Sequence, residues 1–156
     1  MILEPDDYLY LQDGTYLHTK ERSSSAWLSV YTELKKALKA KIFDKVVLVT
    51  GLPASGKSTW VKMHNEEWVI YIVDADLVGK ELRKEVIQQI REHDSNIPIG
   101  IVFLDTNKKV CLERNAKRSV DRVIPLSAYA DMTSVFSYPS TEEGFFHIHF
   151  KWNFSV

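Results

Sequence analysis

Apolar residues follow two kinds of pattern along this chain, short continuous runs and helical spacings. Three runs, at 46–50, 68–73 and 99–104, are rich in Val and Ile. Such runs are typical of parallel strands that are buried on both faces. Between and after them, apolar positions recur at helical spacing over 79–94 and 107–118, which predicts amphipathic helices. This alternation of strands and helices predicts an α/β fold with a mostly parallel sheet.

Weaker patterns flank this central region. Residues 8–18 hold an Asp-Gly pair between two short apolar runs, which predicts a β-hairpin. Ser23–Ser25 can then cap a long helix that has apolar positions at helical spacing and lysines near its end. Near the other end, 126–136 predicts a short helix and the alternating segment 145–150 predicts a last strand. We therefore expect an N-terminal hairpin and helix joined to the α/β unit.

Composition narrows the class of protein. With 156 residues, 45% of them hydrophobic, the chain is long enough for one compact unit. Lys and Arg number 20 against 21 Asp and Glu, so no overall field would draw the protein onto nucleic acid. The first residues are acidic where a secretory signal is basic, and no apolar run has membrane-spanning length. We expect a soluble cytoplasmic protein with no membrane partner.

Several residues that often carry chemistry are expected to have structural roles. The single cysteine, Cys111, cannot form an internal disulfide, and its helical setting predicts a small buried side chain. His147 and His149 would share one face of a strand, but no third ligand lies nearby in the sequence, so we expect surface histidines. The four tryptophans are expected in the core or at its rim; they are Trp27, Trp60, Trp68 and Trp152.

The segment Gly51-Leu-Pro-Ala-Ser-Gly56-Lys57-Ser58 matches G-x-x-x-x-G-K-[S/T] between a predicted strand and a predicted helix. In this setting the backbone N–H groups form an anion-binding nest at the positive end of the helix. Lys57 would reach the β- and γ-phosphates of ATP or GTP, and the Ser58 hydroxyl would bind Mg²⁺. The residues expected to contact the nucleotide are Gly51, Pro53, Ala54, Ser55, Gly56, Lys57, Ser58 and Thr59.

Two further groups of charged residues have the chemistry for phosphoryl transfer. Asp74 and Asp76 follow a buried strand, at the end where open α/β sheets bind ligands. One carboxylate, Asp74 in our interpretation, would join Ser58 at the metal, and Asp74 or Asp76 would act as base. Three arginines, at 114, 118 and 122, are spaced to converge on phosphates and stabilise transition-state charge. The expected catalytic residues are Lys57, Asp74, Asp76, Arg114, Arg118 and Arg122.

Together these motifs resemble the kinase domain of the polynucleotide 5′-hydroxyl kinase family and its P-loop relatives, over about residues 45–150. The specific part of the resemblance is Arg114-Asn-Ala-Lys-Arg118 followed by Val123-Ile-Pro125. It implies a three-layer P-loop NTPase fold, a shortened kinase domain over 43–156 and an N-terminal appendage over 1–42. It also implies that Arg114 and Arg118 are lid residues on the phosphates of ATP; Arg122 matches less closely.

One feature of the family is missing from its usual place. Those kinases have a strand with Asp, and Arg three residues later, between the P-loop helix and the next aspartate. Between Thr59 and Asp74 this chain has room for one helix and one strand only, and Gly79 stands three residues after Asp76. Three alternatives then stay open: Asp74 or Asp76 is the base, the acceptor chemistry differs, or the protein binds nucleotide without efficient transfer.

These observations favour an ATP- and Mg²⁺-dependent phosphotransferase that acts on a hydroxyl group. The resemblance implies a polynucleotide 5′-end as acceptor, whereas modest size and neutral charge favour a nucleotide or another small metabolite. A relationship to zeta-type toxins, which phosphorylate sugar nucleotides, stays open. The alternative from another class is a non-catalytic nucleotide-binding module that docks a partner.

Overall fold

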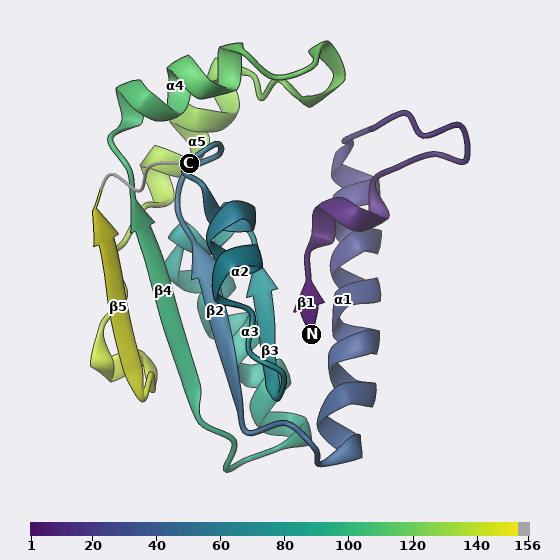
Figure 1. Ribbon diagram of the computed structural model, residues 1–156, viewed down its shortest axis with the longest axis vertical. Coiled ribbons are helices and arrows are strands. Elements are labelled where there is room, and N and C mark those ends of the chain that lie inside the picture. Colours follow the sequence, from purple (N-terminus) through teal and green to yellow (C-terminus); the bar gives the residue numbers. More distant parts are fainter. Residues whose placement is uncertain (153–156) are drawn as a thin grey trace.

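The computed structural model describes residues 1–152, which form one five-stranded sheet with helices on both faces (Figure 1). All strand pairs are parallel and the order across the sheet is β1-β3-β2-β4-β5. The strands are β1 (Ile2–Leu3), β2 (Lys45–Thr50), β3 (Val69–Val73), β4 (Ile99–Asp105) and β5 (His147–Trp152). The predicted α/β class is confirmed, and the sheet is entirely rather than mostly parallel.

Five α-helices accompany these strands. They are α1 (Lys20–Ala40), α2 (Lys57–His64), α3 (Lys80–His93), α4 (Lys108–Ala116) and α5 (Leu126–Val135). Helices α1 and α3 cover one face of the sheet, and α2 covers the other. The layout is therefore a three-layer sandwich of the kind that P-loop proteins have. Helices α4 and α5 lie beyond the carboxyl ends of β2 and β4, at the top of Figure 1.

The core follows from the two-residue period of the buried strands. In β2, Val46 and Leu48 point to the α1 and α3 side, whereas Val49 points to α2. The register places Val46 beside both Ile70 of β3 and Ile99 of β4, so the α1 and α3 side is continuous across the sheet. Because both faces are covered, the central strands have no polar side, which explains their unbroken apolar sequence.

The N-terminal segment differs from the expected appendage. Residues 8–18 double back with a single antiparallel bridge, between Tyr10 and Tyr16, and do not form a two-stranded hairpin. The segment before them contributes β1, the edge strand next to β3, and a 3-10 helix, η1 (Pro5–Tyr8). Helix α1 begins at Lys20, where the Thr19 side chain accepts a hydrogen bond from the Arg22 N–H, and not after the serines. Residues 1–42 thus complete the same sheet and cover it.

Other expectations about single residues have mixed outcomes. Cys111 is buried, as expected, and its thiol donates to the Thr106 carbonyl at 3.6 Å. Trp60 is buried and Trp27 half-buried, but Trp68 and Trp152 are 47% and 69% exposed, so their placement in the core is wrong. Trp68 lies in the turn before β3, and Trp152 is the last residue of the edge strand β5, where its ring stacks with that of Phe150.

A buried ion pair fixes the turn that follows β3. Arg83 of α3 is 0% exposed, and its guanidinium contacts both carboxylate oxygens of Glu143 at 2.8 and 3.1 Å. It also donates to the carbonyls of Leu77 and Val78, at 2.9 and 3.0 Å, in the 3-10 helix η2 (Asp76–Val78). Glu143 belongs to another 3-10 helix, η4 (Thr141–Glu143), so the pair joins the turn after β3 to the segment before β5.

The direction in which the chain crosses the sheet changes at β2. From β2 the chain crosses to β3 on one side, and from β3 it crosses back over β2 to reach β4 on the other side. Open α/β sheets bind ligands in the crevice at the carboxyl ends of the strands where the direction of crossing changes. The candidate loop follows β2 at this position. No helix among the described residues is long and apolar enough to cross a bilayer.

Candidate functional site

The loop from Gly51 to Gly56 joins β2 to α2 through backbone conformations that depend on small residues. Gly51 has φ 147°, and a Cβ atom there would lie 2.5 Å from the Leu104 carbonyl oxygen of the neighbouring strand. Gly56, at φ 102°, is the N-cap of α2. Ala54 has φ 61°, which is left-handed for a residue with a side chain and costs about 1–3 kcal/mol. Strain of this kind clusters at ligand-binding loops.

Side chains from three other elements hold the carbonyl groups of this loop. The Thr106 hydroxyl donates to the Ser55 carbonyl at 2.9 Å, and the Tyr129 hydroxyl of α5 donates to the Pro53 carbonyl at 2.8 Å. The Arg114 guanidinium of α4 lies 3.4 Å from the Ala54 carbonyl oxygen. With its carbonyls bound on one side, the loop can present N–H groups on the other, as an anion-binding nest requires.

Lys57 folds back onto the loop that precedes it. Its Nζ donates to the carbonyl oxygens of Gly51 and Leu52, at 3.0 Å each. Burial lowers the pKa of Lys57 to about 8, and the negative charge of Asp74 opposes this shift. An ammonium group that is satisfied only by neutral carbonyls in a desolvated site has much to gain from an anion.

Asp74 and Asp76 lie together directly after β3. The Asp76 backbone N–H donates to Oδ1 of Asp74 at 2.6 Å. Burial, and secondly the charge of Asp76, raises the pKa of Asp74 to about 8. Burial also raises the pKa of Asp76, while His18 and Lys57 oppose that shift. Two half-buried groups, Lys57 and Asp74, thus lie beside the exposed Asp76, and charged groups with shifted pKa values that cluster in this way are characteristic of functional sites.

The three arginines come from the segment after β4, residues 108–135, which we call the lid. Helix α4 ends at Ala116, so Arg114 and Arg118 do not share a helix as the spacing suggested. Arg118 lies past the helix end and donates to the Arg122 carbonyl at 3.3 Å. Arg122 belongs to the 3-10 helix η3 (Val120–Arg122). The chain turns here because the Asn115 side chain bonds both the N–H and the C=O of Ile124, at 3.0 and 2.8 Å.

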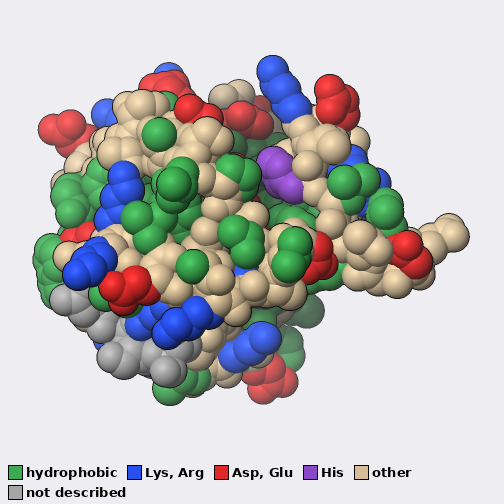
Figure 2. Space-filling model, turned by 90° about the horizontal axis from the view of Figure 1, so that it is seen from above, with side chains coloured by type: hydrophobic (Ala, Val, Ile, Leu, Met, Phe, Trp, Pro, Cys, Tyr) green, Lys and Arg blue, Asp and Glu red, His purple; other side chains and the backbone are tan. Residues whose placement is uncertain are grey.

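One cavity of about 390 Å³ collects these groups. Every catalytic residue expected from the sequence lines it: Lys57, Asp74, Asp76, Arg114, Arg118 and Arg122. Of the expected nucleotide contacts, Pro53, Ala54, Gly56, Lys57, Ser58 and Thr59 line it, whereas Gly51 and Ser55 lie behind them as buried parts of the loop. Seen from above the strand ends, the surface is hollowed between the body of the molecule and a projecting arm (Figure 2).

Residues 4–18, which follow β1 and which we call the arm, supply site residues that the sequence analysis missed. Glu4 and Asp6 follow β1 and line the cavity together with Tyr16 and His18. Acidic residues from the beginning of the chain thus join Asp74 and Asp76 in the walls of the cavity. A two-residue strand has too few positions to show a period, so no sequence pattern marks it.

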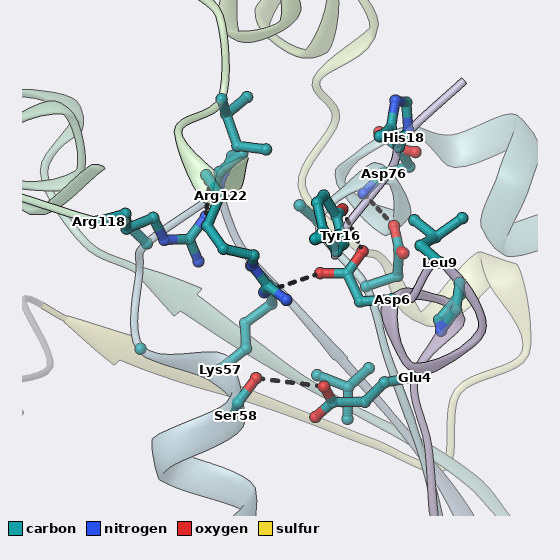
Figure 3. Close-up of a pocket in the computed structure, with 18 of the residues that line it drawn as sticks. Glu4, Asp6, Leu9, Tyr16, His18, Lys57, Ser58, Asp76, Arg118 and Arg122 are labelled. Atoms are coloured by element: carbon teal, nitrogen blue, oxygen red, sulfur yellow. Dashed lines mark hydrogen bonds and ion pairs between the residues drawn. The ribbon is translucent and has the colours of Figure 1, made fainter. Parts of the chain in front are cut away.

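Arg122 connects the lid to the arm. Its guanidinium carbon lies 4.4 Å from the centre of the Tyr16 ring, its Nη2 lies 3.4 Å from Oδ2 of Asp6, and it donates to the Tyr10 hydroxyl. The Tyr16 hydroxyl in turn donates to Asp6 at 3.1 Å. Figure 3 shows Arg122 reaching from the lid toward Asp6 above Lys57. We call this contact the clasp.

The Ser58 side chain faces an acidic residue from the beginning of the chain. Its hydroxyl donates to Oε2 of Glu4 at 3.4 Å (Figure 3). Within residues 1–152, no group of three or more His, Cys, Asp or Glu side chains could hold a metal ion. Mg²⁺ usually takes only one or two carboxylates and completes its shell with phosphate oxygens and water. The donor set of Ser58 with Asp74 fits that mode of binding.

In comparisons with known proteins, no family model matches the chain and no curated protein matches it significantly.

Proposed function

We propose that this protein is an ATP- and Mg²⁺-dependent phosphotransferase that moves the γ-phosphoryl group to a hydroxyl acceptor. The single observation that carries the proposal is the convergence on one cavity of the loop lysine, two strand-end aspartates and three arginines. Binding of a phosphate alone needs fewer cations. Phosphoryl transfer depends on positioning and on charges placed around the transferred group, and these residues supply both.

The residues present suit a bound nucleotide. The loop N–H groups and Lys57 would hold the β- and γ-phosphates, and Lys57 would exchange its carbonyl partners for phosphate oxygens. Ser58 and Asp74 would hold Mg²⁺, which neutralises phosphate charge when bound. Arg114 and Arg118, which the lid brings to the cavity, would stabilise the equatorial oxygens in the transition state. GTP would be held by the same contacts.

Asp76 is placed to orient and deprotonate the acceptor. Burial, and then the charge of Asp76, raises the pKa of Asp74, and a bound cation would relieve both effects, which suits a metal ligand. Asp76 is the more exposed carboxylate and stands at the outer end of the cavity. Asp6 already pairs with Arg122 and accepts a hydrogen bond from the Tyr16 hydroxyl, so we assign it to the clasp.

The experiment is transfer of label from γ-labelled ATP with Mg²⁺ to a mixture of hydroxyl compounds, including 5′-hydroxyl DNA and RNA. We expect labelled product with the wild-type protein and none with Lys57→Met. The matched control is Lys62→Met, an exposed lysine on the same helix, which should keep full activity. ATP binding without transfer to any acceptor would overturn the proposal.

The clasp favours one second candidate, a nucleotide-binding regulatory module. Arg122 contacts the arm through Asp6 and the Tyr16 ring, so a nucleotide that attracts Arg122 would release the arm. Such a module would bind ATP and change the arm without turnover. Limited proteolysis of the arm with and without ATP, beside the transfer assay, separates the two functions.

A further inference from the structure

A second cavity of about 1060 Å³ adjoins the cavity of about 390 Å³ described above, which we call the phosphate cavity. Five residues line both cavities: Tyr16, His18, Asp76, Ile124 and Met132. The second cavity extends from this shared wall between the arm, the start of α3 and helix α5. A ligand in it would reach the γ-phosphate position past Asp76.

The walls of the second cavity are largely apolar. They include Leu17 of the arm, Leu82 of α3, Val123 of the lid, and Ala128 and Val135 of α5. Val135 is 58% exposed and Val123 is 41% exposed, so these side chains keep apolar surface in contact with water. Small-molecule sites are clefts of about 300–1,000 Å³ with mainly apolar walls and a few polar groups. The cavity has that size and character.

The charges around the second cavity exclude a polyanion. Four carboxylates line it, against one lysine. The carboxylates are Asp76, Glu81, Asp121 and Asp131, and the lysine is Lys80. Nucleic acid binds where several Lys or Arg side chains neutralise phosphates, and its affinity comes mainly from them. The three arginines of the site line the phosphate cavity instead.

We propose that the second cavity is the acceptor site and that the acceptor is a small neutral or cationic alcohol with an apolar or aromatic body, not a nucleic acid. This inference rests on the proposed phosphotransferase function. The hydroxyl oxygen of the acceptor forms a bond to the γ-phosphorus of ATP. The bond from that phosphorus to the β,γ-bridging oxygen breaks, its electron pair leaves with ADP, and the hydroxyl proton passes to Asp76.

Helix α5 offers a matched pair of variants for the test. Ala128 lines the second cavity, whereas Ala130, two residues further along the helix, is exposed and lines neither cavity. Ala128→Trp fills the cavity, and Ala130→Trp adds the same side chain outside it. The probes are phenylethanol as a neutral aromatic alcohol, phenylalaninol as a cationic one, and short 5′-hydroxyl DNA and RNA strands.

We expect label transfer from ATP to phenylethanol or phenylalaninol and none to the oligonucleotides. Ala128→Trp should raise KM for the alcohol by about tenfold or more and leave KM for ATP unchanged. Ala130→Trp should change neither constant. Transfer to oligonucleotides only, or equal effects of the two variants, overturns the acceptor assignment and keeps the kinase. A rise in KM for ATP alone with Ala128→Trp would assign the cavity to the nucleotide base and also overturn it.

Direct binding separates failure of this inference from failure of the proposed function. Calorimetry of phenylalaninol with the wild-type protein should show binding that Ala128→Trp abolishes and Ala130→Trp preserves. If the alcohol binds in this way but no label moves to any acceptor, the phosphotransferase function fails and the pocket assignment stands as a binding site. If neither binding nor transfer occurs with the alcohols, the acceptor assignment is overturned.

Discussion

Two charged groups of this protein, on either side of the turn after β3, have opposite character: Arg83 with Glu143 is buried, and Lys57 with Asp74 is half-buried. The Arg83 guanidinium is bound by both oxygens of Glu143 and by two backbone carbonyls. Around the loop, Lys57 has only carbonyl partners, and burial dominates the pKa shifts of both Lys57 and Asp74. Arg83 has a carboxylate counter-ion within the chain, whereas the hydrogen-bond acceptors of Lys57 are uncharged.

The pair of Arg83 and Glu143 has a structural role, and it supports the groups that line the cavity. Arg83 holds the turn that carries Asp76, so the satisfied pair positions the unsatisfied one. The shifted pKa values of Lys57 and Asp74 mean that their charges lower the stability of the free fold. A bound anion and metal would relieve this cost, so these two groups would favour binding at the expense of stability. Variants of the two groups should therefore have opposite effects on stability.

The largest effect is expected from Glu143→Ala. This change leaves the buried Arg83 charge without a counter-ion, and breaking such a pair costs about 3–5 kcal/mol. Urea denaturation measures the loss as a lower midpoint. Glu142→Ala, an exposed neighbour in the same 3-10 helix, is the control and should change stability by no more than about 0.5 kcal/mol. Equal effects of the two variants would contradict the structural role of the pair.

Arg118→Ala should have the next largest effect, on turnover. Its charge is needed mainly where negative charge develops, so kcat should fall by about 100-fold to 1,000-fold with little change in ATP affinity. Steady-state kinetics with the acceptor identified by label transfer measures both constants. Lys117→Ala, an exposed neighbour, is the control. A higher KM at constant kcat would assign Arg118 to ground-state binding instead.

Asp74→Asn should stabilise the ligand-free protein in a pH-dependent way. The pKa of Asp74 in the folded protein, about 8, lies above its ordinary value, so folding favours its protonated form. The contribution of this group to stability is full below its ordinary pKa and is lost as pH rises through about 8. Asparagine stays neutral, so the advantage of the variant should grow over this range.

We expect that advantage to reach about 0.5–2 kcal/mol at the alkaline end, the size usual for relief of a strained functional site. Thermal unfolding without nucleotide or metal, at a series of pH values, measures it. Asp121→Asn, an exposed carboxylate outside the phosphate cavity, serves as control. If the Asp74→Asn protein is less stable than the wild type at pH 8, Asp74 stabilises Lys57 more than burial destabilises Asp74, and the strained-site interpretation is wrong.

The smallest effect is expected from the clasp. Arg122→Ala removes an exposed-side ion pair with Asp6 and the stacking on Tyr16, which together contribute about 0.5–1 kcal/mol. The arm should then be cleaved faster in limited proteolysis, while global unfolding changes little. Arg122→Lys keeps the charge but loses the planar stacking, so its cleavage rate should lie between those of the wild type and Arg122→Ala.

The central fold was predictable because its strands are buried on both faces. Unbroken apolar runs located β2, β3 and β4 to within one residue at each end, and the loop motif located the site above them. The residues expected to be catalytic, which the structure brings to one cavity, could be listed because motif spacing and strand ends are local properties. Arg83 was not recognised, because a charge at a helical position looks solvated until its partner, sixty residues away, is known.

The N-terminal half of the site could not be predicted in the same way. β1 has two residues and shows no alternation, and the arm has one bridge where the sequence suggested a hairpin. Glu4, Asp6 and Tyr16 reach the cavity through pairing of β1 with β3, a contact between segments about seventy residues apart. Local patterns contain no information on such pairing, whereas the edge position next to β3 explains it.

The most direct test of the account is calorimetric titration of the wild-type protein and of Lys57→Met with ATP in the presence of Mg²⁺. The account predicts saturable binding to the wild type and loss of binding in the variant, which should be as stable as the wild type or more stable without ligand. If well-folded wild-type protein gives no binding heat with either ATP or GTP, the proposal that the loop and Lys57 bind a nucleoside triphosphate is contradicted.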